Sequence, residues 1–125
     1  MRAWKNRYAA DLRTGYAVIS SMENPLRASK EEIAAAKDLD RSLSSMVSDL
    51  RGIQPPPGLS SAHAAYLASL EDLAGGVHEL ATALEEGKAM RSFATMATIA
   101  TAWQEGAAAR STLERALGFS LSSAD

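Results

Sequence analysis

Residues 29–53 read SKEEIAAAKDLDRSLSSMVSDLRGI, and this stretch decides the fold. Its apolar residues recur at alternating steps of three and four, which is the spacing of a helix that packs against partner helices. Ser29 and Glu32 form a capping-box pattern at the start, and Gly52 is placed to stop the helix in a left-handed conformation. We therefore predict a helix over about residues 29–51 with a buried seam of Ala36, Leu39, Leu43, Met46, Leu50 and Ile53.

Three further stretches have helical spacing and similar lengths. They predict helices over about residues 3–22, 61–86 and 89–117, each roughly 30–40 Å long at about 1.5 Å per residue. Matched lengths and short connections favour one all-α domain spanning the chain, an antiparallel up-down-up-down four-helix bundle. Two hairpins that dimerise into a larger bundle are the alternative. The breaks between the helices are supplied by Asn24-Pro25, prolines 55–57 and Gly87.

Each of these three helices has an apolar seam that we expect to face the core. The seam of the first is Trp4, Tyr8, Leu12, Gly15, Ile19 and Met22. That of the third is Tyr66, Leu70, Leu73, Val77, Leu80 and Leu84. That of the fourth begins with Met90, Phe93, Met96 or Ala97, Ala100 and Trp103, and Gly118 is a suitable stop after it.

The composition excludes several classes of function. The chain has 125 residues, 46% hydrophobic and 22% charged, which is typical of one globular domain. A net charge of −2 gives no basic footprint, so we expect no nucleic-acid partner. The lack of cysteine excludes disulfides, thiolate catalysis and cysteine metal sites. No apolar run approaches the roughly 20 residues of a membrane span, and no signal peptide opens the chain.

The two histidines do not have the spacing of a metal site. His63 and His78 are 15 residues apart, and neither belongs to a Glu-x-x-His or His-x-x-x-His pattern. The sequence also has no Gly-x-Ser-x-Gly elbow and no glycine-rich phosphate loop. We therefore expect no enzymatic activity, no cofactor and no metal ion.

Residues 54–60 contain three consecutive prolines and are expected to form a stiff strap across one end of the bundle. Aromatic residues with polar atoms can recognise a ligand, and several of them are expected to converge near this strap. At helical spacing such residues are more often core, so we interpret His63 first as a structural residue that the strap satisfies. The ligand-pocket candidates here are Trp4, Tyr8, His63 and Tyr66, with Arg110 beside them.

Four glycines interrupt the predicted helices, at a cost near 1 kcal/mol each relative to alanine. In an antiparallel bundle they fall near one level, and Tyr16 and Trp103, two further ligand-pocket candidates, lie beside them. This waist either brings the helices close together or leaves room for a ligand. We favour close packing because protein interiors are usually filled. The glycines are Gly15, Gly75, Gly76 and Gly106.

The middle of the chain follows a pattern of helix, apolar-x-x-Pro-Pro loop, histidine near the next helix start, and short turn into a last helix. The pattern is carried by LRGIQPPPGL at 50–59, AHAAYL at 62–67, ALEEG at 83–87 and ALGF at 116–119. Over about residues 38–119 the chain resembles bacterial extracytoplasmic helical domains, often lipoproteins or the outer portions of membrane-anchored proteins. The resemblance brings no known activity or catalytic residue; His63 and Tyr66 match its pattern.

The resemblance implies a location outside the cytoplasm and a membrane tether beyond this sequence. Because helical spacing already begins at Ala3, Met1 need not be the natural start; if it is, a cytoplasmic location is expected. We expect a non-enzymatic interaction or sensing module that binds a small ligand or a protein partner through its waist, its strap end or an exposed helix face. The alternative is a cytoplasmic adaptor or chaperone that acts by self-association. Both a monomer and a homodimer are compatible with the sequence.

Overall fold

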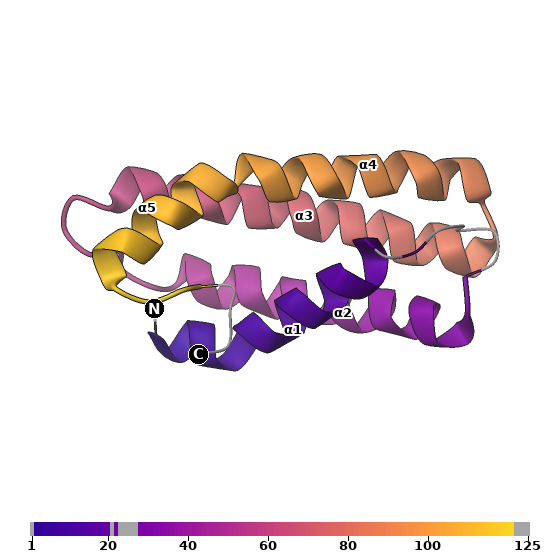
Figure 1. Cartoon of the computed structure of the whole chain (residues 1–125), viewed down its shortest axis with the longest axis horizontal. Helices are drawn as coiled ribbons and strands as arrows, with labels where there is room; N and C mark the ends of the chain where they lie inside the picture. Colours follow the sequence, from indigo (N-terminus) through magenta and orange to yellow (C-terminus); the bar gives the residue numbers. More distant parts are fainter. Residues whose placement is uncertain (1, 21, 23–27, 122–125) are drawn as a thin grey trace.

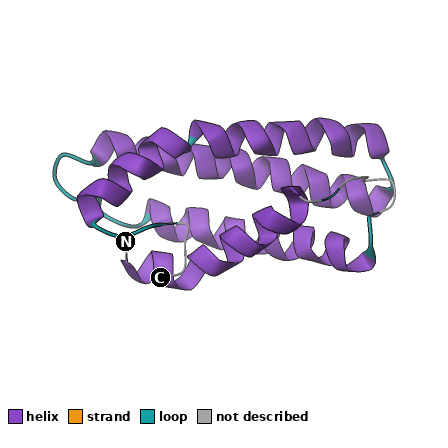
Figure 2. Cartoon of the chain, in the orientation of Figure 1, coloured by secondary structure: helices purple, strands orange, loops and turns teal. Residues whose placement is uncertain are grey.

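The computed structural model of the chain describes residues 2–20, 22 and 28–121, and every regular element in this part is an α-helix (Figures 1 and 2). The chain reverses direction at each connection between its first four helices, which lie side by side along the long axis (Figure 1). The predicted all-α four-helix bundle is confirmed. The helices are α1 (Arg2–Ser20), α2 (Lys30–Arg51), α3 (Ser60–Glu86), α4 (Ala89–Glu105) and α5 (Ala107–Leu117).

The central helix of the bundle is α3. It packs extensively against both α2 and α4, whereas α1 packs chiefly against α2. The contact between α1 and α4 is short. Most of α4 is therefore supported from one side, by α3.

The start of α2 forms as its sequence predicts. The Glu32 backbone N–H donates to Ser29 Oγ at 3.1 Å, and the Ser29 backbone N–H donates to Glu32 Oε1 at 2.9 Å. The expected left-handed stop at Gly52 is wrong, because this residue is right-handed with φ −81°. Left-handed stops do occur at Gly87, with φ 70°, and at Gly118, with φ 79°.

The helix predicted over residues 3–22 is slightly shorter in the structure. It ends at Ser20, and Met22 is buried but not helical. The expected Asn24-Pro25 break lies outside the described residues.

The single helix predicted over residues 89–117 is wrong, because it divides at Gly106 into α4 and α5. Backbone hydrogen bonding continues across the division: Gly106 N–H donates to Ala102 O at 3.2 Å, and Arg110 N–H donates to Gly106 O at 2.9 Å. The division is therefore a bend, and α5 turns from it toward the start of α1 (Figure 1). A Cβ at Gly106 would lie 2.9 Å from the Cβ of Ser69, so glycine lets the bend sit directly on α3.

The predicted seams of α1, α2 and α3 form one core. Leu12, Leu43 and Leu70 are typical of its members, which are buried with almost no exposed surface. Of the residues predicted for these three seams, only Ile53 is partly exposed. Helical periodicity alone therefore identified the buried faces of these helices.

The seam predicted for α4 is wrong at its first two positions, whereas its later members Met96 and Trp103 do pack against the core. Met90 is 84% exposed and Phe93 is 49% exposed, so Phe93 does not join the core of Leu43 and Leu70. Two hydroxyl residues, Ile99 and an alanine are buried instead. Burying their hydroxyls costs little, because each donates to a carbonyl of its own helix: Ser92 to Lys88 at 2.9 Å and Thr95 to Arg91 at 2.7 Å. The buried residues of α4 are Ser92, Thr95, Ile99 and Ala102.

Candidate functional site

The structure brings the strap-end aromatic residues together as expected. The ring centroids of Trp4 and Tyr8 are 5.8 Å apart, and those of Trp4 and Tyr66 are 6.0 Å apart in an edge-on arrangement. All three side chains are buried, as is His63, which lies one turn before Tyr66 on α3. The expected convergence is therefore observed, and the cluster belongs to the core.

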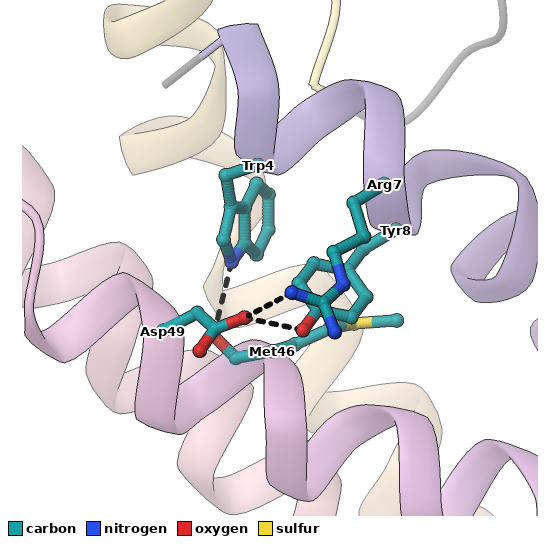
Figure 3. Close-up of polar contacts among 5 residues, drawn as sticks. All are labelled: Trp4, Arg7, Tyr8, Met46 and Asp49. Atoms are coloured by element: carbon teal, nitrogen blue, oxygen red, sulfur yellow. Dashed lines mark hydrogen bonds and ion pairs between the residues drawn. The ribbon is translucent and has the colours of Figure 1, made fainter.

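Two of these aromatic residues use their polar atoms to join α1 to α2 (Figure 3). Trp4 Nε1 donates to the Met46 carbonyl oxygen at 3.0 Å, and the Tyr8 hydroxyl donates to Asp49 Oδ2. Arg7 Nη1 lies 3.4 Å from the same carboxylate oxygen. Burial and the hydrogen bond to Asp49 raise the pKa of Tyr8. These groups form contacts between α1 and α2, and an open pocket of about 430 Å³ lies beside them, lined among others by Trp4, Arg7, Tyr8 and Asp49.

His63 and Tyr66 differ from the other two residues. Within the part of the chain that the structure describes, His63 Nε2 and the Tyr66 hydroxyl are buried and have no hydrogen-bond partner. The expectation that the strap satisfies His63 is therefore wrong for this atom. Burial raises the pKa of Tyr66, and the positive charge of Arg110 opposes that rise.

The missing partner of Tyr66 leads to a prediction about stability. Tyr66→Phe is expected to leave the free energy of unfolding unchanged or to raise it by about 1 kcal/mol, because it removes a buried hydroxyl that forms no bond. Tyr8→Phe is the matched control and is expected to lower it by about 1 kcal/mol, because it removes the hydroxyl's hydrogen bond to Asp49 and leaves that carboxylate only its longer contact with Arg7. Urea unfolding followed by circular dichroism measures both. A loss above 1 kcal/mol for Tyr66→Phe would show that the hydroxyl has a bound partner.

The C-terminal segment closes the strap end. Arg110 on α5 places its guanidinium 4.9 Å from the centroid of the Trp103 ring and its Nε 3.6 Å from Glu114 Oε1. The Leu121 backbone N–H donates to Glu114 Oε2 at 3.2 Å, and both Leu113 and Leu121 are fully buried. These contacts attach α5 and the residues after it to the bundle.

Tyr16 and Trp103 lie together, as expected for candidates beside the waist. Their rings stack with centroids 4.2 Å apart and planes inclined by 17°. The pair links α1 to α4, where these helices otherwise have little contact. The rings therefore fill the space between two helices.

The four glycines do not form a waist at one level. A Cβ at Gly76 would lie 2.9 Å from Ile99 Cγ1, and Gly106 faces Ser69, seven positions and about 10 Å earlier along α3. Gly75 is exposed, and a Cβ there would meet no atom within 4 Å. The favoured outcome is nevertheless confirmed at three positions: Gly15, Gly76 and Gly106 each allow close helix packing.

An open groove of about 570 Å³ runs between α3 and α4. The α3 wall is acidic, with Glu71, Asp72 and Glu79, and is interrupted by the bare backbone of Gly75. The α4 wall is made of small residues, and Glu105 stands at its end. The α4 residues that line the groove are Ala97, Thr98, Thr101, Ala102 and Glu105.

The solvent-exposed side of α4 carries the exposed large hydrophobic residues of the described part of the chain, Met90 and Phe93. No charged residue occurs from Ser92 to Gln104. The exposed threonines also use their hydroxyls internally: Thr98 donates to Ala94 O at 3.3 Å and Thr101 to Ala97 O at 3.1 Å. We call this surface the α4 outer face; it consists of Met90, Arg91, Phe93, Ala94, Ala97, Thr98, Thr101, Gln104 and Glu105.

The surface of α2 shows the contrast. It carries exposed charges of both signs at its start, middle and end, although residues 42–48 are uncharged. Sequence reasoning missed the α4 outer face because it placed Met90 and Phe93 inside the bundle. The sequence did contain an indication of this face. The uncharged run from Ser92 to Gln104 is too long to be buried on every side of a helix, so part of it must face solvent. The exposed charges of α2 are Lys30, Glu31, Asp38, Arg41, Asp49 and Arg51.

The described residues contain neither a membrane-spanning helix nor a metal-binding cluster. No helix there is long and apolar enough to cross a membrane. No group of three or more histidine, aspartate or glutamate side chains in that same part of the chain is placed to hold a metal ion. Comparison of the chain with known protein families, curated proteins and solved structures finds no match.

Proposed function

We propose that this chain is a non-enzymatic protein-interaction module that acts through the α4 outer face. The observation that carries this proposal is an exposed helix face with Phe93 and Met90 at one end and no charge over about four turns. Cores of protein–protein interfaces are depleted of charged residues and enriched in aromatic residues and methionine. The α4 outer face has this composition, and the exposed face of α2 does not.

The strap end is the weaker candidate for a binding surface. Its aromatic residues are buried, and Trp4 and Tyr8 already have hydrogen-bond partners within the bundle. The open pocket beside them is lined by Arg7 and Asp49, and these two charged groups already pair with each other. A partner on the α4 outer face displaces only water.

The resemblance of residues 38–119 to bacterial extracytoplasmic helical domains supports a proposal about location. We place the module outside the cytoplasm, tethered to a membrane by a segment beyond this sequence. A solvent-facing helix with no charge between Arg91 and Glu105 is then available to a partner in the same compartment.

Site-specific photocrosslinking in the cells that produce the protein tests the proposed function. A photoreactive p-benzoylphenylalanine is placed at Ala97 on the α4 outer face, and the control is at Ala34, an exposed alanine on α2. We expect one adduct of defined mass from position 97 and none from position 34. Equal crosslinking at both positions, or none at position 97, would contradict the proposal.

A further inference from the structure

We infer that the partner of the α4 outer face is a second copy of this chain, with the two α4 helices packed antiparallel. This inference rests on the proposed function, because it names the occupant of the same surface. Three observations carry it: the positions of two charges, the absence of charge between them, and the size of the residues along the seam.

The two charges of the α4 outer face lie at opposite ends of one stripe. Arg91, Ala94, Thr98, Thr101 and Glu105 follow steps of three and four, and all are exposed. Arg91 and Glu105 are fourteen positions apart, which is about 21 Å along the helix. Neither forms an ion pair with any residue that the structure describes.

The surroundings of each charge strengthen this polarity. Near the basic end, Lys88 is paired with Glu86 at 2.8 Å and the charge of Arg91 also acts on that carboxylate, so these two cations exceed the one anion between them. Near the acidic end, Glu71 is paired with Arg51 at 2.9 Å, whereas Asp72 on the groove wall adds its charge to that of Glu105. One end of the stripe is therefore positive and the other is negative.

An antiparallel pair of α4 helices centred on Thr98 matches these ends. In that register Arg91 of each copy lies opposite Glu105 of the other, which gives two symmetric ion pairs around an uncharged centre. A parallel pair would place like charges together at both ends. The charge pattern is therefore complementary to a second copy of itself in one orientation only.

The seam between the two charges is suited to close helix packing. Ala94 and Ala97 have short side chains, and Thr98 and Thr101 turn their hydroxyls to their own backbone. Small residues let two helix backbones approach closely. Met90 and Phe93 stand beside the seam, where the Gln104 end of the second copy would cover their exposed surface.

Sedimentation equilibrium with charge-reversal variants tests the inference. Wild type is expected to dimerise, and R91E and E105R are each expected to weaken the dimer dissociation constant about tenfold, because two attractive contacts become repulsive. The double variant R91E/E105R is expected to return to within about threefold of wild type, because both pairs are restored with their signs exchanged. The control R13E, an exposed charge on α1, is expected to have no effect. Circular dichroism confirms that each variant is folded.

Two results would overturn the inference. One is a wild-type chain that stays monomeric up to about 1 mM, which places any dimer dissociation constant well above that concentration. The other is a double variant whose dimer dissociation constant stays as high as those of the single variants. Failure of the inference is distinguishable from failure of the proposed function. If position 97 crosslinks to a protein of different mass and the chain is monomeric, the interaction module stands and the second copy is excluded. If position 97 yields no adduct, both the proposed function and the second copy as partner are excluded.

Discussion

Replacing Trp4 by alanine is expected to lower the free energy of unfolding by about 3–5 kcal/mol, the range for removing a buried aromatic residue. Trp4 is buried, contacts the rings of Tyr8 and Tyr66, and donates a hydrogen bond to the Met46 carbonyl at 3.0 Å. It therefore links α1 to both α2 and α3. Trp4→Ala leaves a cavity at that junction and removes the second hydrogen bond of the Met46 carbonyl, which keeps its bond within α2.

Trp4→Phe is the matched control, because it keeps an aromatic ring and removes the indole N–H. We expect it to lower the free energy of unfolding by about 1–2 kcal/mol, less than half the loss of Trp4→Ala. Urea unfolding monitored by far-ultraviolet circular dichroism measures both. If the two variants were equally stable, the ring of Trp4 would not be the junction of three helices described here.

The adjacent glycines Gly75 and Gly76 are expected to respond to alanine with opposite signs. Gly76→Ala places a Cβ 2.9 Å from Ile99 Cγ1, and Ile99 is itself fully buried. Overpacking of this kind lowers the free energy of unfolding by about 1–3 kcal/mol, which exceeds the gain in helix propensity. Gly75→Ala meets open space and is expected to raise it by about 0.5–1 kcal/mol.

Thermal unfolding of the two variants beside wild type checks this prediction. The two glycines are adjacent in α3, so alanine brings the same gain in helix propensity at both positions. The difference between the unfolding temperatures of the two variants therefore reports the contact between α3 and α4. Stabilisation by both substitutions would mean that α4 does not approach α3 as closely as the structure shows.

The fold was predictable where large apolar residues mark one face of a helix. Leu12, Leu43, Leu70 and their seam neighbours are too large to be exposed in series, so periodicity placed them correctly. The start of α2 was predictable because a capping box is a local interaction between Ser29 and Glu32. These features depend on spacing and on near neighbours in the chain.

The rotation of α4 was not predictable in this way. Its buried positions are Ser92, Thr95, Ile99 and Ala102, and Ile99 packs against the bare backbone of Gly76, so that α4 approaches α3 closely there. Ser92 and Thr95 satisfy their hydroxyls on their own helix, so polarity did not keep them outside. The distance between α3 and α4 therefore decides which face of α4 is buried. The spacing of apolar residues in the sequence does not indicate that distance.

The candidate site was predictable only in part, for related reasons. The convergence of Trp4, Tyr8 and Tyr66 follows from helix length and register, and it was found. The missing partner of His63 Nε2 depends on the exact position of the strap, which the sequence does not specify. The α4 outer face could be identified only after the rotation of α4 was known.

The rotation of α4 is the central claim, because both proposals depend on which residues it leaves outside. The chain contains no cysteine, so single substitutions report on one position each. The decisive measurement is the rate of thiol labelling of Phe93→Cys and Thr95→Cys at low micromolar concentration. We predict that Phe93→Cys reacts nearly as fast as an unfolded peptide, whereas Thr95→Cys, which must wait for local opening, reacts at least about 100-fold more slowly. The reverse order of rates would place Phe93 inside the bundle and contradict the account.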